Sequence, residues 1–317
     1  MYDYIISKLI LNTFLSSEKI SIIDCGARGG SLSDWDSLGK YIVLYGFDPD
    51  EAECTRLNEM ANSKGYKHFY FPFCLAGKNE YNRKFYITNN LSSCSLYQPN
   101  EKRIKRFRSS AFGKPMPTQN AVGLKEIIEI NTICLDSWSK NNNITDIDFI
   151  KLDIQGAELE VLTGGSALLQ TVLGLNVEVW FIPVYIGQPL FCDIDIFLRS
   201  HNFDFFSMYI YTAGQFSGRM VSPIVFDKVN TFWEQRYAGQ LVTADVLYLK
   251  DPIHLESPDT NTIKLLKLIC IAEMCNQVEY AFELLVYMRE IFKLNGYNKE
   301  AELIEEIFNQ SAKAYIA

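Results

Sequence analysis

The chain has 317 residues, of which 48% are hydrophobic and 21% are charged, so it can bury a full core and is neither disordered nor fibrous. A formal net charge of -8 argues against a protein that wraps nucleic acid over its whole surface, because phosphate binding needs a concentrated basic face. No apolar run approaches the roughly 20 residues of a membrane span. Residues 1–14 also lack the basic start and cleavage site of a secretory signal. We therefore expect a cytoplasmic protein.

The predicted elements alternate between strands and helices, as in a doubly wound, Rossmann-like α/β sheet. An amphipathic helix at residues 2–14 comes first, and we assign residues 1–19 to it. Strands are predicted near residues 20–24, 41–47, 66–74, 83–88, 126–135, 148–153, 172–181 and 245–249, with a short helix at 136–141. The sheet domain therefore takes in residues 20–252.

The alternation is interrupted at residues 89–125, where Ser, Asn, Pro and Gly predict an insertion or lid rather than core. Six basic residues gather there, namely Lys102, Arg103, Lys105, Arg106, Arg108 and Lys114, together with Phe107 and Phe112. They would grip an anionic acceptor such as an acidic glycan, or form a solvated loop, and the second interpretation is favoured. Four aromatic residues further on would stack on sugar faces or serve as core or lid: Tyr209, Tyr211, Phe216 and Trp233.

A helical period replaces the alternation from residue 258 onward, and three helices are predicted. We assign residues 253–317 to an all-helical appendage that covers the sheet or pairs subunits, so a homo-oligomer is possible. The eight cysteines contain no C-x-x-C pair and the chain has only three histidines, so no metal site is expected from them.

A glycine-rich turn directly after the first predicted strand is the most informative motif. Residues 24–30 read Asp-Cys-Gly-Ala-Arg-Gly-Gly, and glycines let a backbone approach a ligand closely. About 20 residues later the next strand ends in Asp48, a carboxylate that can accept both hydroxyls of a ribose. The two features together predict half of a nucleoside site.

The spacing of the glycines bears on which nucleotide would bind. A dinucleotide fingerprint needs a middle glycine where this chain has Ala27 and Arg28, so pyrophosphate recognition is disfavoured. Asp24 opens the turn with a negative charge that would repel phosphate and attract a cation, which favours S-adenosylmethionine. Asp24 alone decides nothing, because Asp also commonly caps helices and forms turns.

Residues 148–164 read DFIKLDIQGAELEVLTG, and this segment resembles the FkbM family of S-adenosylmethionine-dependent methyltransferases. The resemblance also covers the turn at residues 24–30, the Phe-acid-Pro segment at 47–49, and the V-E-V-W and Y-I-G-Q segments at 177–180 and 185–188. It extends from about residue 20 to residue 250. It implies a class I methyltransferase sheet.

The resemblance also implies positions for the cofactor. Asp24, Gly26, Ala27 and Gly30 would lie at its methionine part, Asp48 at the ribose, and Leu75 or Ala76 near the adenine. Asp153, which ends the fourth strand, would lie where the methyl group points, and Glu178 ends the neighbouring strand.

Methyl transfer to oxygen needs a group that removes a proton from an alcohol, either a carboxylate base or a metal ion. Asp153, Glu158 and Glu178 are the candidate carboxylates, and Tyr185 is a weaker candidate that would orient the substrate. Paired acids at adjacent strand ends can hold Mg²⁺, although a metal-free site is favoured. Glu158 would alternatively serve only the dipole of its helix, and the stem of Lys151 would pack beside its strand.

Two departures from the family pattern concern the site: Gln155 stands where many members have Glu, and Asp48 replaces the more usual Glu. The resemblance implies an O-methyltransferase acting on a sugar, a glycan or a small natural product, and an association with polysaccharide biosynthesis. A non-catalytic scaffold that uses the last helices is the alternative, and a nicotinamide-dependent oxidoreductase is a distant third.

Overall fold

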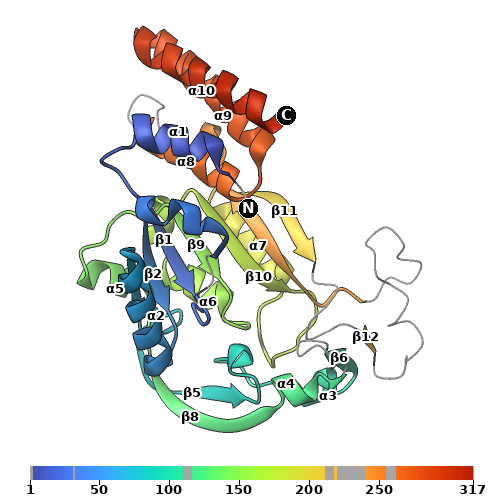
Figure 1. Ribbon diagram of the computed structural model, residues 1–317. Coiled ribbons are helices and arrows are strands. Elements are labelled where there is room, and N and C mark those ends of the chain that lie inside the picture. Colours follow the sequence, from blue (N-terminus) through green and yellow to red (C-terminus); the bar gives the residue numbers. More distant parts are fainter. Residues whose placement is uncertain are drawn as a thin grey trace.

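The computed structural model describes residues 3–30, 33–109, 116–210, 218–219, 240–254 and 262–316. Seven strands form the main sheet in the order β11-β13-β10-β9-β1-β2-β3 (Figure 1). They are β1 (Ile20–Cys25), β2 (Ile42–Phe47), β3 (Lys67–Phe71), β9 (Phe149–Leu152), β10 (Gly174–Trp180), β11 (Asp204–Ile210) and β13 (Thr243–Leu249). β13 runs antiparallel to β10 and β11, and the other pairs of this sheet are parallel. This is the class I methyltransferase sheet that the resemblance implied.

The centre of the sheet fixes the position of the site. β1 pairs in parallel with β2 through Ile20 and Ile42, and with β9 through Ile22 and Phe149. The chain adds β2 and β3 on one side of β1, and β9 and β10 on the other, so the strand order reverses between β1 and β9. In open α/β sheets ligands bind at such a reversal, outside the carboxyl ends of the strands.

Helices cover both faces of the sheet. On one face lie α2 (Glu51–Lys64), the turn helix η1 (Ser33–Tyr41) and the terminal helices described below. On the other lie α5 (Leu135–Asn141), α6 (Glu158–Gly164), α7 (Phe191–Ser200) and the short η3 (Leu168–Gln170). The side chain of Asp50 begins α2 by accepting the N–H groups of Ala52 and Glu53, as an N-cap does.

A second sheet crosses the carboxyl edge of the first. It consists of β4 (Cys74–Leu75), β8 (Leu124–Ile133) and β5 (Glu80–Thr88), and β8 curves beneath the main sheet in Figure 1. The predicted strand at residues 66–74 is divided in two, because Pro72 has no N–H to continue the ladder of β3.

The predicted insertion at residues 89–125 contributes to a small core of its own. It contains η2 (Leu91–Ser93), α3 (Glu101–Ile104), β6 (Phe107–Ser109), β7 (Met116–Pro117) and α4 (Gln119–Val122), and β6 also pairs with β12 (Gly218–Arg219). Ile104 and Phe107 are buried with Trp180 and Tyr185, so part of the segment packs on the main domain. Phe112, Lys114, Tyr211, Phe216 and Trp233 lie outside the described residues.

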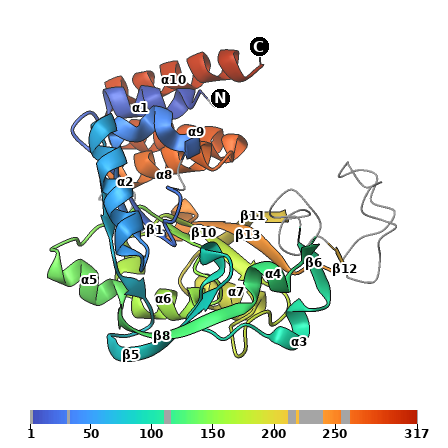
Figure 2. The same cartoon turned by 60° about the horizontal axis from the view of Figure 1, so that its bottom comes forward.

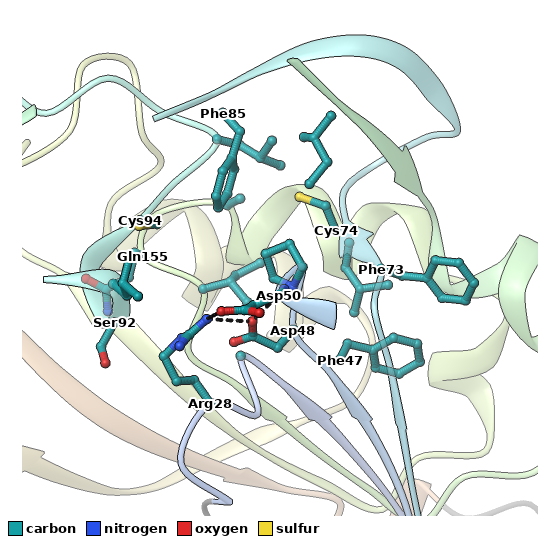
Figure 3. A pocket seen from close by; sticks show the side chains of 18 of the residues that line it. Arg28, Phe47, Asp48, Asp50, Phe73, Cys74, Phe85, Ser92, Cys94 and Gln155 are labelled. Atoms are coloured by element: carbon teal, nitrogen blue, oxygen red, sulfur yellow. Dashed lines mark hydrogen bonds and ion pairs between the residues drawn. The ribbon is translucent and has the colours of Figure 1, made fainter. Parts of the chain in front are cut away.

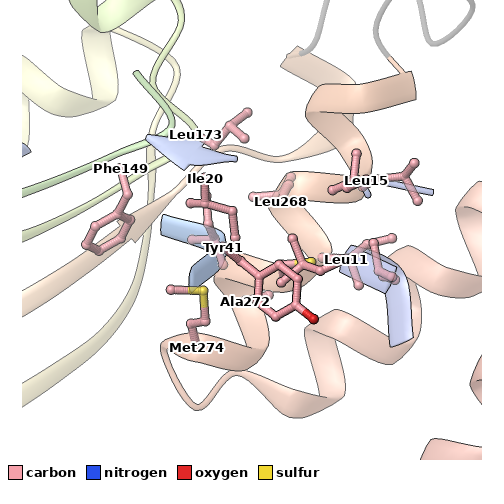
Figure 4. Packing of buried hydrophobic residues seen from close by; sticks show 14 of the residues in the cluster. Leu11, Leu15, Ile20, Tyr41, Phe149, Leu173, Leu268, Ala272 and Met274 are labelled. Carbon is pink, nitrogen blue, oxygen red and sulfur yellow. The ribbon is translucent and has the colours of Figure 1, made fainter. Parts of the chain in front are cut away.

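Three helices follow the short η5 (Pro252–His254), namely α8 (Thr262–Met274), α9 (Val278–Leu294) and α10 (Asn298–Ile316). They pack with the N-terminal helix α1 (Ile5–Thr13) as a helical layer beside the sheet, in which α8 is innermost (Figure 2). α8 is buried almost all round because it lies between the sheet and these other helices. Figure 4 shows Leu268 and Ala272 of α8 near Leu11, Ile20 and Tyr41.

Buried polar groups fix this layer to the sheet. The carboxylate of Asp148 accepts hydrogen bonds from Lys264 at 2.7 Å and Lys267 at 2.9 Å. Glu273 accepts the backbone N–H groups of Ile6 and Ser7 and thus caps α1 from a distant part of the chain. Within the described residues, no helix has both the length and the apolar composition to cross a membrane.

Candidate active site

A cavity of about 490 Å³ opens at the carboxyl ends of β1, β2 and β9 (Figure 3). Its polar wall consists of Arg28, Asp48, Asp50, Lys151, Asp153 and Gln155. Its apolar wall includes Phe73, Leu75, Phe85, Ile87, Ile128 and Ile130, together with further apolar residues. A concave, mostly apolar cavity with a few convergent polar groups is the usual form of a small-molecule site.

The glycine turn is built to bring β1 against β9. Gly26 has a φ of +84°, and a Cβ there would lie 1.9 Å from the carbonyl oxygen of Asp153. The N–H groups of Gly26 and Ala27 both donate to the carbonyl oxygen of Phe47 at 3.0 Å. These two donors are therefore used within the fold, and charged side chains are left to contact the polar part of a ligand.

Arg28 reaches across this turn to the end of β2. Its Nη2 donates to Oδ1 of Asp48 at 3.1 Å and to Oδ2 of Asp50 at 2.8 Å. Oδ1 of Asp48 also accepts the backbone N–H of Asp50 at 2.9 Å. Burial raises the pKa of Asp48, while the Asp50 N–H and the Arg28 charge oppose that rise. Oδ2 of Asp48 takes no hydrogen bond from the described part of the chain and is left for a ligand.

Lys151 lies between two acids. Its Nζ is 3.4 Å from Oδ1 of Asp24 and 3.9 Å from Oδ2 of Asp153. Burial opposes its charge, but the charges of Asp24 and Asp153 outweigh burial and raise the pKa of Lys151. The sequence predicted only the packing of the stem of Lys151, and the structure adds that this lysine lines the cavity.

Gln155 connects three of the residues at the next strand ends. Its Nε2 donates to Oδ1 of Asp153 at 2.9 Å and to Oε2 of Glu178 at 2.8 Å. Its Oε1 lies 3.0 Å from the hydroxyl of Tyr185, which also lies 3.0 Å from the carbonyl oxygen of Ser93. Of this set, Asp153 and Gln155 line the cavity, and Glu178 and Tyr185 lie buried behind them.

The buried surroundings of Glu178 and Tyr185 disfavour ionisation of their side chains. Burial, followed by the charge of Asp153, raises the pKa of Glu178 well above its ordinary value. Burial also raises the pKa of Tyr185 well above its ordinary value. Asp153 is more accessible, with 41% of its side chain exposed. Of the three carboxylates predicted to be catalytic, it is the one that lines the cavity.

Glu158 turns away from the cavity and stabilises the turn between β9 and α6. Its carboxylate accepts the N–H of Ile154 at 3.1 Å and that of Gly156 at 3.0 Å. Burial raises the pKa of Glu158 to about 7. These contacts favour the structural interpretation of Glu158.

Half of the residues predicted to bind the cofactor line the cavity: Gly26, Asp48, Leu75 and Asp153. The others form its support and are Asp24, Ala27, Gly30 and Ala76. Ala27 and Ala76 are fully buried in the core. Gly30 faces Leu57 of α2, where a Cβ would come within 3.1 Å.

Sequence reasoning missed Arg28 and the apolar wall contributed by β5 and β8. A signal for the wall exists, because Phe85 and Ile87 are two residues apart, as are Ile128 and Ile130, and such pairs share one face of a strand. Within the described ranges, no three His, Cys, Asp or Glu side chains gather as ligands for a metal ion.

Comparisons with known proteins bear on the chemistry of this cavity. Residues 24–205 match the family model described as the methyltransferase FkbM domain. A search of curated proteins found no match.

Solved structures give weak likenesses. The StiE O-MT (residues 961–1257) is 10% identical, with a TM-score of 0.37, over 86% of this chain and 79% of that one. Magnesium protoporphyrin IX methyltransferase from Synechocystis PCC 6803, with bound SAM, is 12% identical, with a TM-score of 0.35, over 79% of this chain and 78% of that one. At such scores the family match is the finding that identifies the chain.

Proposed function

Because the chain belongs to the FkbM methyltransferase family, we propose that its cavity binds S-adenosylmethionine and that it methylates a hydroxyl group of a sugar, a glycan or a small natural product. The observation that carries the proposal is the placement of Asp48 and Asp153 in one cavity, on opposite sides of the reversal between β1 and β9. Asp48 suits a ribose there, and Asp153 suits a reacting hydroxyl.

The residues present fit the donor along its whole length. Oδ2 of Asp48 would accept a ribose hydroxyl, and Phe73 and Leu75 offer an apolar surface for the adenine. Arg28 and Lys151 bring positive charge to the carboxylate of the methionine part, since the first N–H groups of the glycine turn are already used.

Asp153 is our proposed general base, because it is the member of the predicted catalytic set that lines the cavity. Its carboxylate would accept the proton of the acceptor hydroxyl, a role worth about 10²- to 10⁴-fold in rate. When bound, the donor supplies an electrophilic methyl group. Glu178 and Tyr185 would act through Gln155 and not by touching the acceptor.

The binding of S-adenosylhomocysteine, measured by calorimetry, tests the cofactor assignment. We expect the wild type to bind and Asp48→Ala to bind at least about tenfold more weakly. Asp36→Ala removes an exposed carboxylate paired with Lys64, so it is the matched control and should bind normally. Failure of the wild type to bind either this ligand or NAD would favour the alternative of a non-catalytic scaffold.

Methyl transfer itself is tested with tritium-labelled S-adenosylmethionine and a panel of nucleotide sugars, polysaccharides and small alcohols. Asp153→Asn should lose at least about 100-fold in transfer, a loss much larger than any change in its binding of S-adenosylhomocysteine. Transfer at the wild-type rate by this variant would exclude Asp153 as the base.

A further inference from the structure

The backbone at Gln155 adopts a conformation that disfavours its own side chain. Its φ is +62°, in the left-handed region that favours glycine, and the next residue is a glycine with a φ of +108°. The hydroxyl of Ser95 holds the turn by donating to the carbonyl oxygen of Gln155 at 2.7 Å. A non-glycine residue in such a conformation next to a cavity commonly has a function. Here the strained backbone places the side chain of Gln155 at the cavity wall.

The hydrogen bonds determine how the amide is oriented. Nε2 carries two hydrogens, and its two acceptors are the carboxyl groups of Asp153 and Glu178. Oε1 faces the hydroxyl of Tyr185. A flipped amide would aim its oxygen at both acids, so the arrangement is the one that the three neighbours require.

We propose that Gln155 is a positioning residue whose amide occupies the place of a cation between Asp153 and Glu178, and that it holds the Asp153 carboxylate toward the cavity. This inference rests on the proposed function, in which Asp153 is the base. Two N–H groups pointed at two carboxyl groups supply the partial positive charge that an ion would otherwise supply. The second carboxyl group, Glu178, is buried and cannot be stabilised by water.

The proposal makes a prediction about one substitution. Gln155→Glu exchanges the donor for a third carboxylate at the point where two acids already meet. Three carboxylates with hard oxygen atoms form a ligand set for a divalent cation, in contrast to two acids bridged by an amide. The variant should therefore gain a site for Mn²⁺ or Ca²⁺ that the wild type lacks.

Calorimetry and thermal unfolding with MnCl₂ test this gain. We expect Gln155→Glu to bind Mn²⁺ at least about tenfold more tightly than the wild type and to show a higher melting temperature when the ion is present. The thermal measurement reports binding even if the variant is destabilised. Gln155→Gly, which suits the backbone but brings no ligand, is the matched control and should show neither effect.

Two results would overturn the inference: Mn²⁺ binding by the wild type as tight as that of Gln155→Glu, or no gain by Gln155→Glu. Adding Glu178→Gln to Gln155→Glu should abolish the gain, and its persistence would show that the ion binds elsewhere and would equally overturn the proposal. Binding of S-adenosylhomocysteine by the same proteins is scored separately. A failure of the proposed function is thereby distinguished from a failure of the role of Gln155.

Discussion

Arg28 donates a hydrogen bond to the same carboxylate oxygen of Asp48 that accepts the backbone N–H of Asp50, at 3.1 Å and 2.9 Å respectively. One oxygen of Asp48 is thus used within the protein, and the other is presented to the cavity. The guanidinium also offsets part of the cost of burying a carboxylate at the end of β2.

Arg28→Met should weaken S-adenosylhomocysteine binding by about tenfold. Removal of the guanidinium takes away an influence that lowers the pKa of Asp48, so this pKa rises further. Protonated Asp48 accepts a ribose hydroxyl poorly. The loss measured by calorimetry should therefore be larger at about pH 5.5 than at about pH 7.5. Arg56→Met, which removes an exposed arginine paired with Glu53, is the control and should change little.

Gly26 and Gly29 share a φ of +84° but differ in their surroundings, which makes them a matched pair. Gly29→Ala meets no atom within 4 Å and should cost about 1 to 2 kcal/mol of backbone strain. Gly26→Ala introduces the same backbone strain and also places a methyl group against the carbonyl oxygen of Asp153. We expect Gly26→Ala to unfold at a clearly lower urea concentration than Gly29→Ala. Equal midpoints would contradict the close contact between β1 and β9.

Glu158 should make the free energy of unfolding depend on pH. Its pKa in the folded protein is about 7, above an ordinary value of about 4.3. Between those values the folded state retains a proton that the unfolded state releases. Stability is therefore lost as the pH rises, by roughly 3 to 4 kcal/mol in all. Urea unfolding at several pH values should show a clearly shallower slope in Glu158→Gln than in the wild type, and the slope that remains comes from Glu178 and Asp48, whose pKa values are also raised. The exposed Glu129→Gln should retain the wild-type slope, and a common slope for all three proteins would refute the assignment.

The attachment of α8 to the sheet should depend on Asp148. This carboxylate is fully buried and pairs with Lys264 and Lys267, so Asp148→Asn leaves Lys267 without its counter-charge and Lys264 with Asp146 alone. We expect a loss of about 3 to 5 kcal/mol in urea unfolding. Asp146 also contacts Lys264, but its side chain is half exposed. Asp146→Asn should therefore lower the free energy of unfolding by less than about 1 kcal/mol. Similar losses for the two variants would show that the buried network does not anchor the helix.

β1, β2 and β9 at the centre of the sheet could be predicted because each is a largely apolar run that is followed directly by an acid or a glycine. The prediction of a strand at residues 41–47 corresponds to β2 at Ile42–Phe47, and that at 245–249 corresponds to β13 at Thr243–Leu249. β11 at Asp204–Ile210 was not among the predicted strands, and its partner in the sheet is a strand about 40 residues later. β6, β7 and β12 are too short to show any period.

The residues of the candidate site also differ in whether the sequence predicts them. Gly26, Asp48 and Asp153 could be found because strand ends meet at one edge of a parallel sheet, and each of them follows a recognisable strand. The pairing of Arg28 with Asp48 depends on the path of a turn, and the apolar wall depends on how far β8 curves beneath the main sheet. The pairing leaves no local pattern, and the i, i+2 pairs of β5 and β8 mark a shared strand face without showing which cavity that face lines. Gln155 was visible as a departure from the family, but two of its three partners, Glu178 and Tyr185, are 23 and 30 residues away in the sequence.

The capping of α1 by Glu273 joins residues that are 267 positions apart. On a ribosome, the first helix would thus leave the exit tunnel long before the side chain that completes it exists. The apolar surface on one face of the sheet would likewise remain uncovered until α8 has been synthesised. Until translation has passed α8, chaperones are therefore expected to be needed to shield the exposed apolar surface of the nascent chain.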